Sequence, residues 1–439
     1  MKRTRGTMIV FAALFALLMT LQASALEWRT SWTASVQGPY PVGYPMAQPD
    51  LSLAFPDPEQ GAVDQSFRML VKPNIWGDMA RIRFTNAYGA KPLTIDGAFA
   101  GLHQAAGAIV AGTNTPVTFG GGKSVTIPPG GSAWSDAVAL PFAKDIPVKY
   151  LYGKKLAVSL HVAGESGPMT WHALGLSTNY ISWPRAGSLG SNESDAAFPF
   201  SAVSWFFVDA VDMLAPSETK VVVCLGDSIT DGHYSTINGD DRWPDELSRF
   251  MHAKYGNSVS VVNAGISGNE VVGPDVYGPD SPYNGGPSVK DRLERDLLSL
   301  SGVSAVLWLE GINDLHTGGR SAKEVENGMR DTVQRIRRAA PGVRIFACTL
   351  VSSKNSTIGE YGAAAIDAKR RELNAFIRST DIFDGVIEFD AATLDPETGM
   401  LRPAYGPDSS FGLEPDWLHP NRAGLLKMAE AIDLEAILP

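Results

Sequence analysis

The sequence predicts a chain of two parts: an all-β sandwich or jelly roll over residues 26–214, followed by an α/β part over residues 220–439. Two observations lead to this division. The first half contains short alternating segments separated by Gly- and Pro-rich turns, which is typical of β-sandwiches and jelly rolls. The second half alternates apolar segments with helical patterns, which is typical of a doubly wound parallel sheet covered by helices on both faces.

Five segments of the first half show the alternation, or near-alternation, of apolar and polar residues that is expected of strands. They are Gln65–Val71, Ala80–Thr85, Pro92–Asp96, Lys155–Val162 and Trp205–Met213. Glycine- and proline-rich stretches lie between these segments and supply the turns. No long amphipathic helical pattern interrupts them, so we expect this part of the chain to be all β.

Residues 215–219 are interpreted as a short polar linker, after which the pattern of the sequence changes. The strands expected after the linker are 221–225, 259–262, 305–309, 343–350 and 386–389. The helices are expected near 243–254, 322–339, 363–378 and 422–438. Because strands and helices alternate, the connections between strands are expected to be right-handed crossovers in one parallel sheet.

The composition is that of a globular protein, with 44% hydrophobic and 19% charged residues. The formal net charge of -10 argues against a nucleic-acid partner and against binding to an anionic membrane surface. We therefore expect neither, and the sequence does not indicate an oligomeric state.

The first 25 residues have the pattern of a secretory signal peptide. Basic residues at positions 2, 3 and 5 precede an apolar run over 8–21, and Ala23-Ser-Ala25 has the small residues of a cleavage site. We expect cleavage near Ala25, which makes the mature protein secreted or periplasmic and leaves it without an integral membrane span. The alternative is a retained membrane anchor, for which the apolar run is short.

Cys224 and Cys348 are the only two cysteines. Each lies in an apolar run that we interpret as a core strand of the α/β part. If these are the first and fourth strands, another strand separates them, whereas a disulfide needs a close approach of the two Cα atoms. We therefore expect two buried free thiols.

A serine follows the first apolar strand of the α/β part. The run 221–225 ends in Gly226-Asp227-Ser228, which places a hydroxyl just past the carboxyl end of the strand. In open α/β sheets, ligands bind at that edge. Ser228 is therefore a candidate nucleophile, provided that the chain supplies a base, a group that orients the base, and oxyanion donors. The alternative is a serine that only caps the following helix.

Asp416 and His419 lie far downstream, in Asp-Trp-Leu-His-Pro. At this spacing the two side chains can face the same side of a turn, so that the carboxylate orients the imidazole. Such a carboxylate fixes the tautomer and stabilises the imidazolium that forms when a serine loses its proton. The alternative is an ordinary helix start with a capping aspartate.

Two further segments follow strands and offer oxyanion donors. Asn313 lies in Gly-Ile-Asn-Asp after the strand 305–309, and the loop 263–269 contains Gly265 and Gly268. A glycine allows a backbone N–H to approach a ligand closely, and a donor aimed at a developing oxyanion typically contributes about 3–4 kcal/mol. Each segment alone could be an ordinary turn, but together the four segments can fill the distinct roles of a hydrolytic site.

These four segments resemble the sequence blocks of SGNH (GDSL) hydrolases, and the β part ahead of them resembles bacterial two-domain members of that family. The resemblance implies a doubly wound, flavodoxin-like hydrolase domain. It implies Ser228 as nucleophile, His419 as base and Asp416 as the group that orients His419. It also implies an oxyanion hole formed by the Ser228 N–H, the Gly268 N–H and the Asn313 side-chain amide.

The choice of Gly268 over Gly265 also comes from the resemblance, because the family's pattern places this glycine after a small polar residue and before Asn or Asp.

Other polar residues near the four segments are weaker candidates. His233 is expected to turn away from Ser228 along the helix, and Asp227 is expected to stabilise the turn. Asp231 could orient or cap, and His316 could line the pocket, so the roles of His233 and His316 stay open.

The three histidines of the β part, His103, His161 and His172, lack metal-ligand spacing. No His-Glu-x-x-His, Cys-x-x-Cys or P-loop motif occurs in the chain, so we expect no metal and no cofactor. The Gly-x-Ser-x-Gly elbow of α/β-hydrolases is absent as well.

The expected function is that of a serine esterase that hydrolyses carboxylic esters through an acyl-enzyme, with short acyl groups, especially acetyl, on carbohydrate or small alcohols. No long apolar lid segment is visible, and a β-sandwich beside a hydrolase can bind a glycan. The alternatives are a lipase-like or aryl esterase, an acyltransferase, or a non-catalytic glycan-binding protein. None of the four motifs lies in residues 26–214, so any contribution of this part to the chemistry is expected to be indirect.

Overall fold

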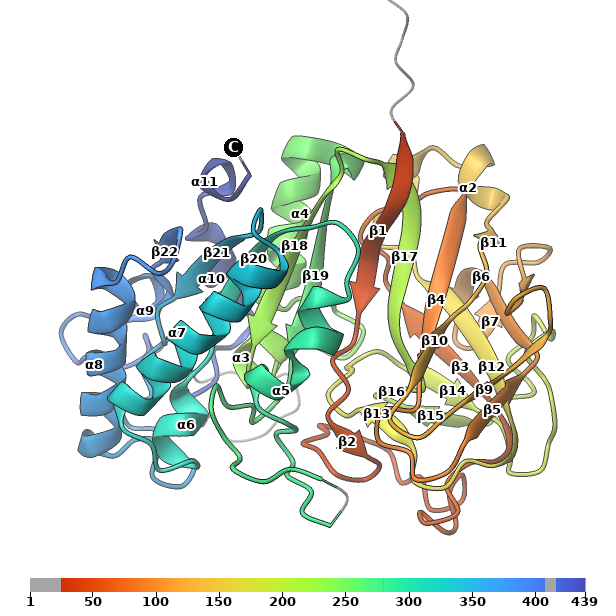
Figure 1. Ribbon diagram of the computed structural model, residues 1–439, viewed down its shortest axis with the longest axis horizontal. Helices are drawn as coiled ribbons and strands as arrows, with labels where there is room; N and C mark the ends of the chain where they lie inside the picture. The colour runs from red at the N-terminus through yellow and green to blue at the C-terminus, as the bar shows by residue number, and fades with distance from the viewer. Residues whose placement is uncertain (1–24, 279, 407–415, 439) are drawn as a thin grey trace, which may run out of the picture.

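The structure, a computed structural model, describes residues 25–278, 280–406 and 416–438. The signal peptide predicted over residues 1–25 therefore lies outside the described residues, apart from Ala25. No helix in the described ranges is long and apolar enough to cross a membrane. Figure 1 shows two parts side by side, an N-terminal part made of strands and a C-terminal part in which strands and helices alternate.

The first sheet of the N-terminal part is antiparallel and has the order β1-β17-β4-β10, with β11 also paired to β4. Its strands are β1 (Leu26–Thr33), β4 (Met79–Thr85), β10 (Ser132–Trp134), β11 (Val138–Ala139) and β17 (Val208–Pro216). The first and last strands of this part are neighbours, because β1 pairs with β17 along its length.

The second sheet is also antiparallel and has the order β15-β14-β3-β12-β5-β9, with β6 paired to β12, β7 and β8. Its strands are β3 (Val63–Val71), β5 (Leu93–Asp96), β6 (Ala98–Ala105), β7 (Ala108–Ile109), β8 (Thr115–Val117), β9 (Ser124–Ile127), β12 (Leu156–Glu165), β14 (Asn179–Ile181) and β15 (Phe200–Ala202). A third, small sheet joins β2 (Gly38–Pro39), β13 (Thr170–His172) and β16 (Trp205–Phe206). Two short helical turns complete this part, α2 (Phe142–Asp145) and η1 (Val148–Tyr150).

One hydrophobic core is shared by the two larger sheets. Fully buried side chains from both sheets form it, among them Phe67, Ile82, Phe84, Leu160 and Met213. Two antiparallel sheets that pack through a common apolar core have the architecture of a β-sandwich. The all-β character of the first half is therefore confirmed, whereas jelly-roll connectivity stays a prediction.

The segment Trp205–Met213, predicted as one strand, is two strands in the structure. β16 ends at Phe206 and β17 begins at Val208, because Phe207 between them has φ 61. A residue in the left-handed region cannot continue an extended strand. The prediction of a single strand was wrong for this reason.

The C-terminal part is built on a parallel sheet with the order β19-β18-β20-β21-β22. Numbered from the first strand of this part, the order is 2-1-3-4-5, which is the flavodoxin-like order of doubly wound sheets. Gly226 pairs with Gly265 on one side and with Leu309 on the other, so three strands end together at one edge. The strands are β18 (Lys220–Gly226), β19 (Val259–Gly265), β20 (Val303–Leu309), β21 (Arg344–Cys348) and β22 (Gly385–Ile387).

Helices cover both faces of this sheet (Figure 1). On one face α4 (Trp243–Tyr255) contacts α10 (Arg422–Glu430), and on the other α7 (Ala322–Ala339) contacts α5 (Val289–Leu293) and α8 (Ala364–Ser379). The remaining helical segments are short: α3 (Ser228–Asp231), η2 (Gly256–Ser258), η3 (Glu294–Leu298), α6 (Ile312–His316), α9 (Phe389–Thr393) and α11 (Leu434–Ile437).

The helix predicted over 422–438 is interrupted. α10 ends at Glu430 and α11 begins at Leu434. Between them, Asp433 accepts hydrogen bonds through Oδ1 from the backbone N–H groups of Glu435 and Ala436. An aspartate that caps a helix in this way has left the helical conformation itself, so the prediction of one continuous helix was wrong.

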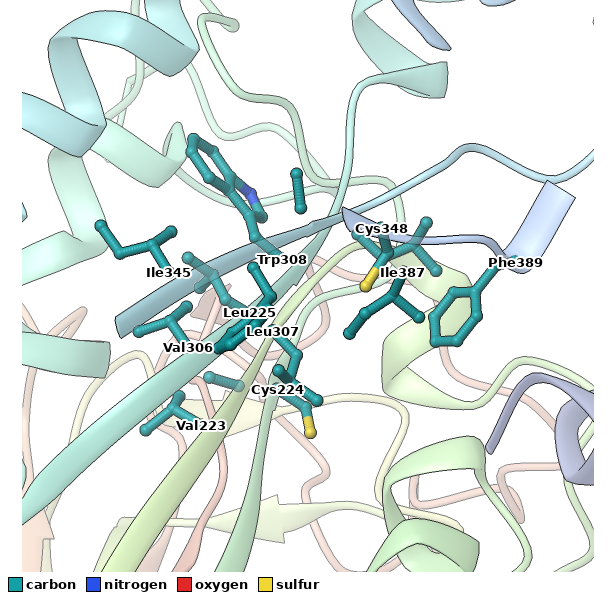
Figure 2. Packing of buried hydrophobic residues seen from close by; sticks show 14 of the residues in the cluster. Val223, Cys224, Leu225, Val306, Leu307, Trp308, Ile345, Cys348, Ile387 and Phe389 are labelled. Carbon is teal, nitrogen blue, oxygen red and sulfur yellow. The ribbon is translucent and has the colours of Figure 1, made fainter. Parts of the chain in front are cut away.

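The core of the parallel sheet contains both cysteines (Figure 2). Cys224 lies on β18 and Cys348 on β21, with β20 between these strands, and both thiols are buried and free. The structure thus agrees with the prediction of two free thiols. Burial raises the pKa of both thiols well above the usual value, so they are protonated and chemically inert.

The two parts of the chain join without a flexible linker. Ala215 and Pro216, predicted as linker, are the last residues of β17, and only residues 217–219 separate this strand from β18. The Arg29 guanidinium donates hydrogen bonds to two backbone carbonyl groups of this short turn. In addition, β1 lies against β19, so a strand of the β part packs beside the parallel sheet.

Candidate active site

Ser228 begins the short helix α3 directly after β18. Asp227 is the N-cap residue, and its Oδ1 accepts a hydrogen bond from the Ile229 N–H at 3.0 Å. Gly226 leaves no room for a side chain, because a Cβ there would lie 2.3 Å from the Leu309 carbonyl oxygen. The N–H of Ser228 is in the first turn of the helix, where N–H groups have no acceptor within the helix. Both the hydroxyl and the N–H of Ser228 therefore lie at the carboxyl edge of the sheet.

The structure brings Asp416 and His419 to this serine. The Ser228 Oγ lies 2.8 Å from His419 Nε2, and His419 Nδ1 lies 2.5 Å from Asp416 Oδ2. Asp416 Oδ1 accepts hydrogen bonds from the backbone N–H groups of Leu418 at 2.8 Å and His419 at 2.9 Å. The turn that carries both residues thus holds the carboxylate in place from its own backbone. The three residues form one continuous hydrogen-bonded chain.

The charge state of Asp416 fixes the direction of these hydrogen bonds. Burial alone raises the pKa of Asp416, but the neighbouring His419 and the hydrogen bonds from His419 and Leu418 lower it to about 2. An ionised carboxylate only accepts hydrogen bonds, so His419 Nδ1 carries a proton. In the neutral ring, Nε2 is then the acceptor for the Ser228 hydroxyl.

Two aromatic residues after α3 pack against His419. The ring of His233 lies 4.1 Å from the ring of His419 between centroids, and that of Tyr234 lies 5.7 Å away. Burial, with a smaller effect of His419, lowers the pKa of His233 well below its usual value. A neutral His233 packs beside His419 without placing a second positive charge there. The side chain of His233 therefore contacts His419, whereas its backbone N–H donates to the Ser228 carbonyl oxygen at 2.9 Å.

His233, Asp416 and His419 each offer one donor atom, and these atoms lie within 4.8 Å of one another, a spacing that suits a metal ion. Both ring nitrogens of His419 are already engaged, however, one by Asp416 and the other by Ser228. A metal bound to His419 would have to replace one of these hydrogen bonds. We therefore assign no metal site to this group of residues.

Asn313 lies in α6, at the same edge of the sheet, and is held from both ends of its amide. Its Nδ2 donates to the Asn269 carbonyl oxygen at 2.9 Å, and its Oδ1 accepts from the Tyr361 hydroxyl at 2.7 Å. Among the described residues, no second acceptor takes the other hydrogen of Nδ2, so this hydrogen is available to a ligand.

The two glycines of the preceding loop differ in the use of their N–H groups. The Gly265 N–H donates to Asn263 Oδ1 at 2.8 Å and is therefore engaged. Gly268 has φ 82, and no acceptor among the described residues takes its N–H. A Cβ on Gly268 would lie 2.5 Å from Cε2 of Tyr44, a residue of the β part whose side chain is 40% exposed. Of the two glycines, Gly268 is thus the one with a free donor.

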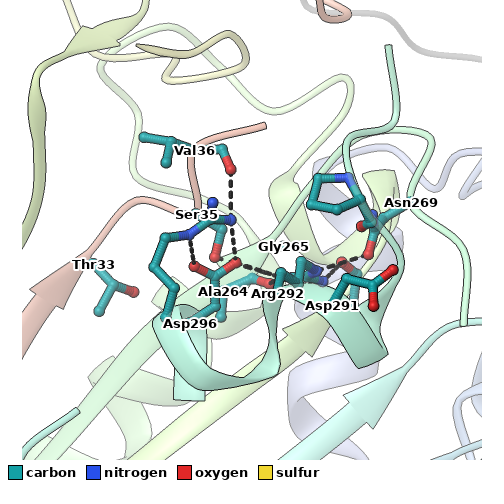
Figure 3. A network of polar contacts seen from close by, with 12 residues as sticks. Thr33, Ser35, Val36, Ala264, Gly265, Asn269, Asp291, Arg292 and Asp296 are labelled. Atoms are coloured by element: carbon teal, nitrogen blue, oxygen red, sulfur yellow. Dashed lines mark hydrogen bonds and ion pairs between the residues drawn. The ribbon is translucent and has the colours of Figure 1, made fainter. Parts of the chain in front are cut away.

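A buried arginine holds the strand ends and the Gly268 loop together (Figure 3). The Arg292 guanidinium donates to the carbonyl oxygens of Gly226 at 3.0 Å and Ala264 at 2.7 Å, and to Asn269 Oδ1 at 2.8 Å. It also pairs with Asp296 at 3.1 Å. Because one rigid fork binds β18, β19 and the loop, Arg292 fixes the donors of the site relative to the serine.

Three further aromatic side chains lie near Asn313 and the Gly268 loop. The ring of His316 stacks on Tyr361 at 3.7 Å between centroids, and His316 Nε2 accepts from the Glu360 N–H. His316 therefore reaches Asn313 only through Tyr361. The Tyr283 hydroxyl donates to Glu270 Oε1 at 2.8 Å and lies 3.1 Å from the Gly268 carbonyl oxygen.

Three buried carboxyl groups lie behind the site. The pKa of Asp227 is raised to about 7, and the pKa values of Glu310 and Asp314 are raised to about 8. Burial is the main cause, and repulsion between the neighbouring carboxyl groups raises the three pKa values further. Backbone N–H groups of Val271 and Val272 hydrogen-bond to Asp314 and partly offset the shift. Asp227 thus has the turn-stabilising role that the sequence predicts, together with a raised pKa.

Sequence analysis missed Arg292, Tyr361 and Tyr44, and it assigned no role to His172, which contacts Asp231 at 2.9 Å. No local signal could have revealed them. Tyr361 is 48 residues from Asn313 in the chain, and His172 is 59 residues from Asp231. Their roles depend on contacts that only the folded chain creates.

Comparison with known proteins gives a family for the C-terminal part. Residues 224–425 match the model of the GDSL-like Lipase/Acylhydrolase family. No curated protein matches the chain. One similar solved structure is a carbohydrate acetylesterase from Sinorhizobium meliloti, with 16% identity and a TM-score of 0.36 over 48% of this chain and 95% of that one. Another is an aryl esterase from M. smegmatis, with 16% identity and a TM-score of 0.37 over 48% of this chain and 95% of that one. A GDSL-like lipase from Bacteroides thetaiotaomicron is similar at 18% identity and a TM-score of 0.37, over 51% of this chain and 89% of that one.

The match to the family model begins at residue 224, near the end of β18, and extends beyond His419 into α10. It thus includes all four segments in which the sequence resembles SGNH hydrolases. The C-terminal part of the chain carries a GDSL-like lipase/acylhydrolase domain, and the protein is a carboxylic ester hydrolase.

Proposed function

We propose that the protein is a secreted serine esterase in which Ser228, His419 and Asp416 form the catalytic triad. The observation that carries the proposal is the hydrogen-bonded chain from the Ser228 hydroxyl through both nitrogens of His419 to Asp416, at 2.8 and 2.5 Å. A serine, a base and a group that orients the base, in this order, are what nucleophilic catalysis requires.

In the first half of the reaction, Ser228 Oγ attacks the ester carbonyl carbon and its proton moves to His419 Nε2. The tetrahedral intermediate then collapses, the bond to the alcohol oxygen breaks, and His419 returns the proton to the leaving alkoxide. In the second half, water attacks the acyl-enzyme with His419 again taking the proton, and the acid is released with Ser228 restored. Asp416 stays ionised and stabilises the imidazolium in both halves.

Three donors are proposed to stabilise the oxyanion of each tetrahedral intermediate: the Ser228 N–H, the Gly268 N–H and the free hydrogen of Asn313 Nδ2. All three belong to segments that end at the carboxyl edge of the sheet, and none of the three donors is taken by an acceptor among the described residues. Donors already held in place stabilise the charge without reorganisation, and each is typically worth about 3 kcal/mol.

The proposed substrates are esters of short acyl groups, acetyl above all, on carbohydrate or small alcohols. The half-exposed ring of Tyr44 lies at Gly268, so an aromatic surface borders the proposed oxyanion hole. An aromatic face of this kind can pack against a sugar ring or an aryl group. Lipase-like or aryl esterase activity and acyl transfer to an alcohol remain the alternatives. Hydrolysis of p-nitrophenyl acetate, octanoate and palmitate, together with acetate release from acetylated glycans, distinguishes them.

The test of the catalytic assignment is Ser228→Ala. We expect a folded protein whose kcat/KM on p-nitrophenyl acetate is lower by roughly three or more orders of magnitude. A fluorophosphonate should label Ser228 in the unaltered protein and nothing in the variant. Ser260→Ala is a matched control, because Ser260 is a buried serine of β19 whose Oγ has no hydrogen-bond partner among the described residues. Labelling at another residue, or an active Ser228→Ala, would refute the assignment, whereas an unaltered protein that hydrolyses no ester would favour a non-catalytic glycan-binding role.

Secretion is proposed from the N-terminal sequence alone. Expression of the whole chain in a bacterial host, followed by sequencing of the exported protein, should give a new N-terminus at Leu26. Recovery of the uncleaved chain in the membrane fraction would instead favour the retained anchor.

A further inference from the structure

One histidine of the β part reaches into the α/β part. His172, at the end of β13, places Nε2 2.9 Å from Asp231 Oδ1 and Nδ1 2.7 Å from the Ser35 carbonyl oxygen. The side chains of His172 and Asp231 are each only 3% exposed. A carbonyl oxygen and a carboxylate can only accept hydrogen bonds, so both ring nitrogens of His172 carry protons. The pair is therefore a buried imidazolium and carboxylate across the junction of the two parts.

Asp231 connects the helix of Ser228 with the loop of Gly268. It is the last residue of α3, which begins at Ser228, and its Oδ2 accepts a hydrogen bond from the Ser267 N–H at 2.8 Å. Ser267 immediately precedes Gly268. The carboxylate of Asp231 thus holds the backbone one residue before the proposed oxyanion donor, while its other oxygen is held by His172.

We propose that His172 is a positioning residue of the active site, which acts from the β part through Asp231 on the loop that carries Gly268. This inference rests on the proposed function, because it assigns the Gly268 N–H to the oxyanion hole. Without His172, Asp231 is a buried carboxylate that has lost its cationic partner, which is an unfavourable state. Asp231 then turns toward other donors and releases the Ser267 N–H. A small displacement of the Gly268 N–H is sufficient to weaken catalysis.

Other charged groups face the same pair. Burial lowers the pKa of His172, and the positive charge of Arg242 lowers it further. The charge of Asp231 and the hydrogen bonds to Asp231 and Ser35 outweigh both effects, so the pKa is raised. A small cavity of about 60 Å³ adjoins both residues, and its other charged lining residues are Lys72, Lys155, Asp240, Arg242 and Asp245. The raised pKa keeps His172 protonated to a higher pH than an ordinary histidine, and above it the neutral ring still has one N–H to donate to Asp231.

Two substitutions separate the two hydrogen bonds of His172. The amide nitrogen of Asn lies where Nδ1 of histidine lies, so His172→Asn keeps the bond to Ser35 and loses Asp231. The amide nitrogen of Gln lies where Nε2 lies, so His172→Gln keeps the bond to Asp231. Asn257→Ala is a control for the junction as such, because Asn257 exchanges hydrogen bonds of 3.0 and 2.7 Å with the Trp76 backbone. It lies before β19, at the end of that strand away from the site.

The variants are compared with the full unaltered chain by thermal unfolding and by kcat and KM on p-nitrophenyl acetate. We expect His172→Asn to lower kcat about tenfold to a hundredfold with little change in KM. His172→Gln should retain most of the kcat, and Asn257→Ala should lower Tm while leaving kcat unchanged.

The inference is overturned if His172→Asn keeps kcat within about twofold, or if Asn257→Ala loses as much kcat as His172→Asn for an equal loss of Tm. Should His172→Asn not fold, His172→Gln decides, since a folded His172→Gln that loses kcat tenfold or more also overturns it. An unaltered protein that hydrolyses no ester refutes the proposed function and this inference with it. An active unaltered protein with an equally active His172→Asn refutes the inference alone.

Discussion

At the scale of single residues, the donors of the site depend on neighbours that hold them. Asn313→Ala removes the only side-chain donor of the proposed oxyanion hole, and we expect kcat on p-nitrophenyl acetate to fall by about 10²–10³ with KM little changed. Tyr361→Phe should cost less, because Asn269 still holds the Asn313 amide through Nδ2. Steady-state kinetics on both purified variants checks this order, and equal losses would contradict it.

What the sequence could predict at this scale follows from distance along the chain. Asp416 and His419 lie three residues apart, so their mutual contact is a local property and was predicted. Ser228 was predicted because a strand, a glycine and a capping aspartate precede it directly. Arg292 binds carbonyl groups of two different strands, a role that depends only on how the strands are packed. Such a role leaves no pattern in the sequence.

At the scale of elements, predictions succeeded where a pattern was long and failed where one residue interrupted it. The helix predicted over 322–339 is α7, with the same bounds and a capping box at Ser321. By contrast, Phe207 and Asp433 each break an element that the apolar pattern alone would continue. Interruptions of this kind depend on the backbone conformation or the capping bond of a single residue, which periodicity does not reveal.

The cap of α3 gives a prediction about stability and pH. Asp227 caps the helix through Oδ1, its Oδ2 has no hydrogen-bond partner in the part of the chain that the structure describes, and its pKa is raised to about 7. In the unfolded chain an aspartate has a pKa of about 3.9, so the folded protein binds the proton more tightly. Stability from this group is therefore present at low pH and decreases as pH rises toward 7.

Asp227→Asn keeps the capping oxygen and cannot ionise. The Tm of the variant minus that of the unaltered protein should therefore increase between pH 5 and pH 8. Thermal unfolding monitored by circular dichroism at both pH values measures this difference. A difference that stays constant, or that decreases, would show that Asp227 is ionised in the folded protein throughout this range.

At the scale of the whole molecule, the β part and the α/β part are joined by buried polar contacts in addition to the chain itself. Arg295 donates to the Tyr88 hydroxyl at 2.8 Å and to the Val36 carbonyl oxygen at 2.7 Å. Lys72 pairs with Asp245 at 2.6 Å. Every motif of the proposed site lies after residue 220, so the sequence alone suggests that the β part takes no part in the site. In the structure, by contrast, His172 of the β part contacts Asp231 beside the site.

This difference leads to opposite expectations for a protein shortened to residues 216–439. The motifs alone favour retained activity on a small aryl acetate and a larger loss on a polymeric substrate. The structure favours loss on both, because the shortened protein lacks the partners of Asp231 and Arg295 and exposes the side of β19 that β1 covers. Arg295 keeps its ion pair with Asp296, but a buried carboxylate without its cation and an uncovered strand are both destabilising.

We therefore expect the shortened protein to unfold at a lower temperature than the full mature chain, or to be recovered unfolded. Where it is folded, kcat/KM should be reduced to a similar extent on p-nitrophenyl acetate and on an acetylated glycan. Circular dichroism and steady-state kinetics on both substrates measure these outcomes, with full-length Asn257→Ala as the control for a weakened junction. A folded shortened protein that keeps its kcat/KM on the aryl acetate and loses only the glycan would show that the β part serves substrate binding and not the support of the site.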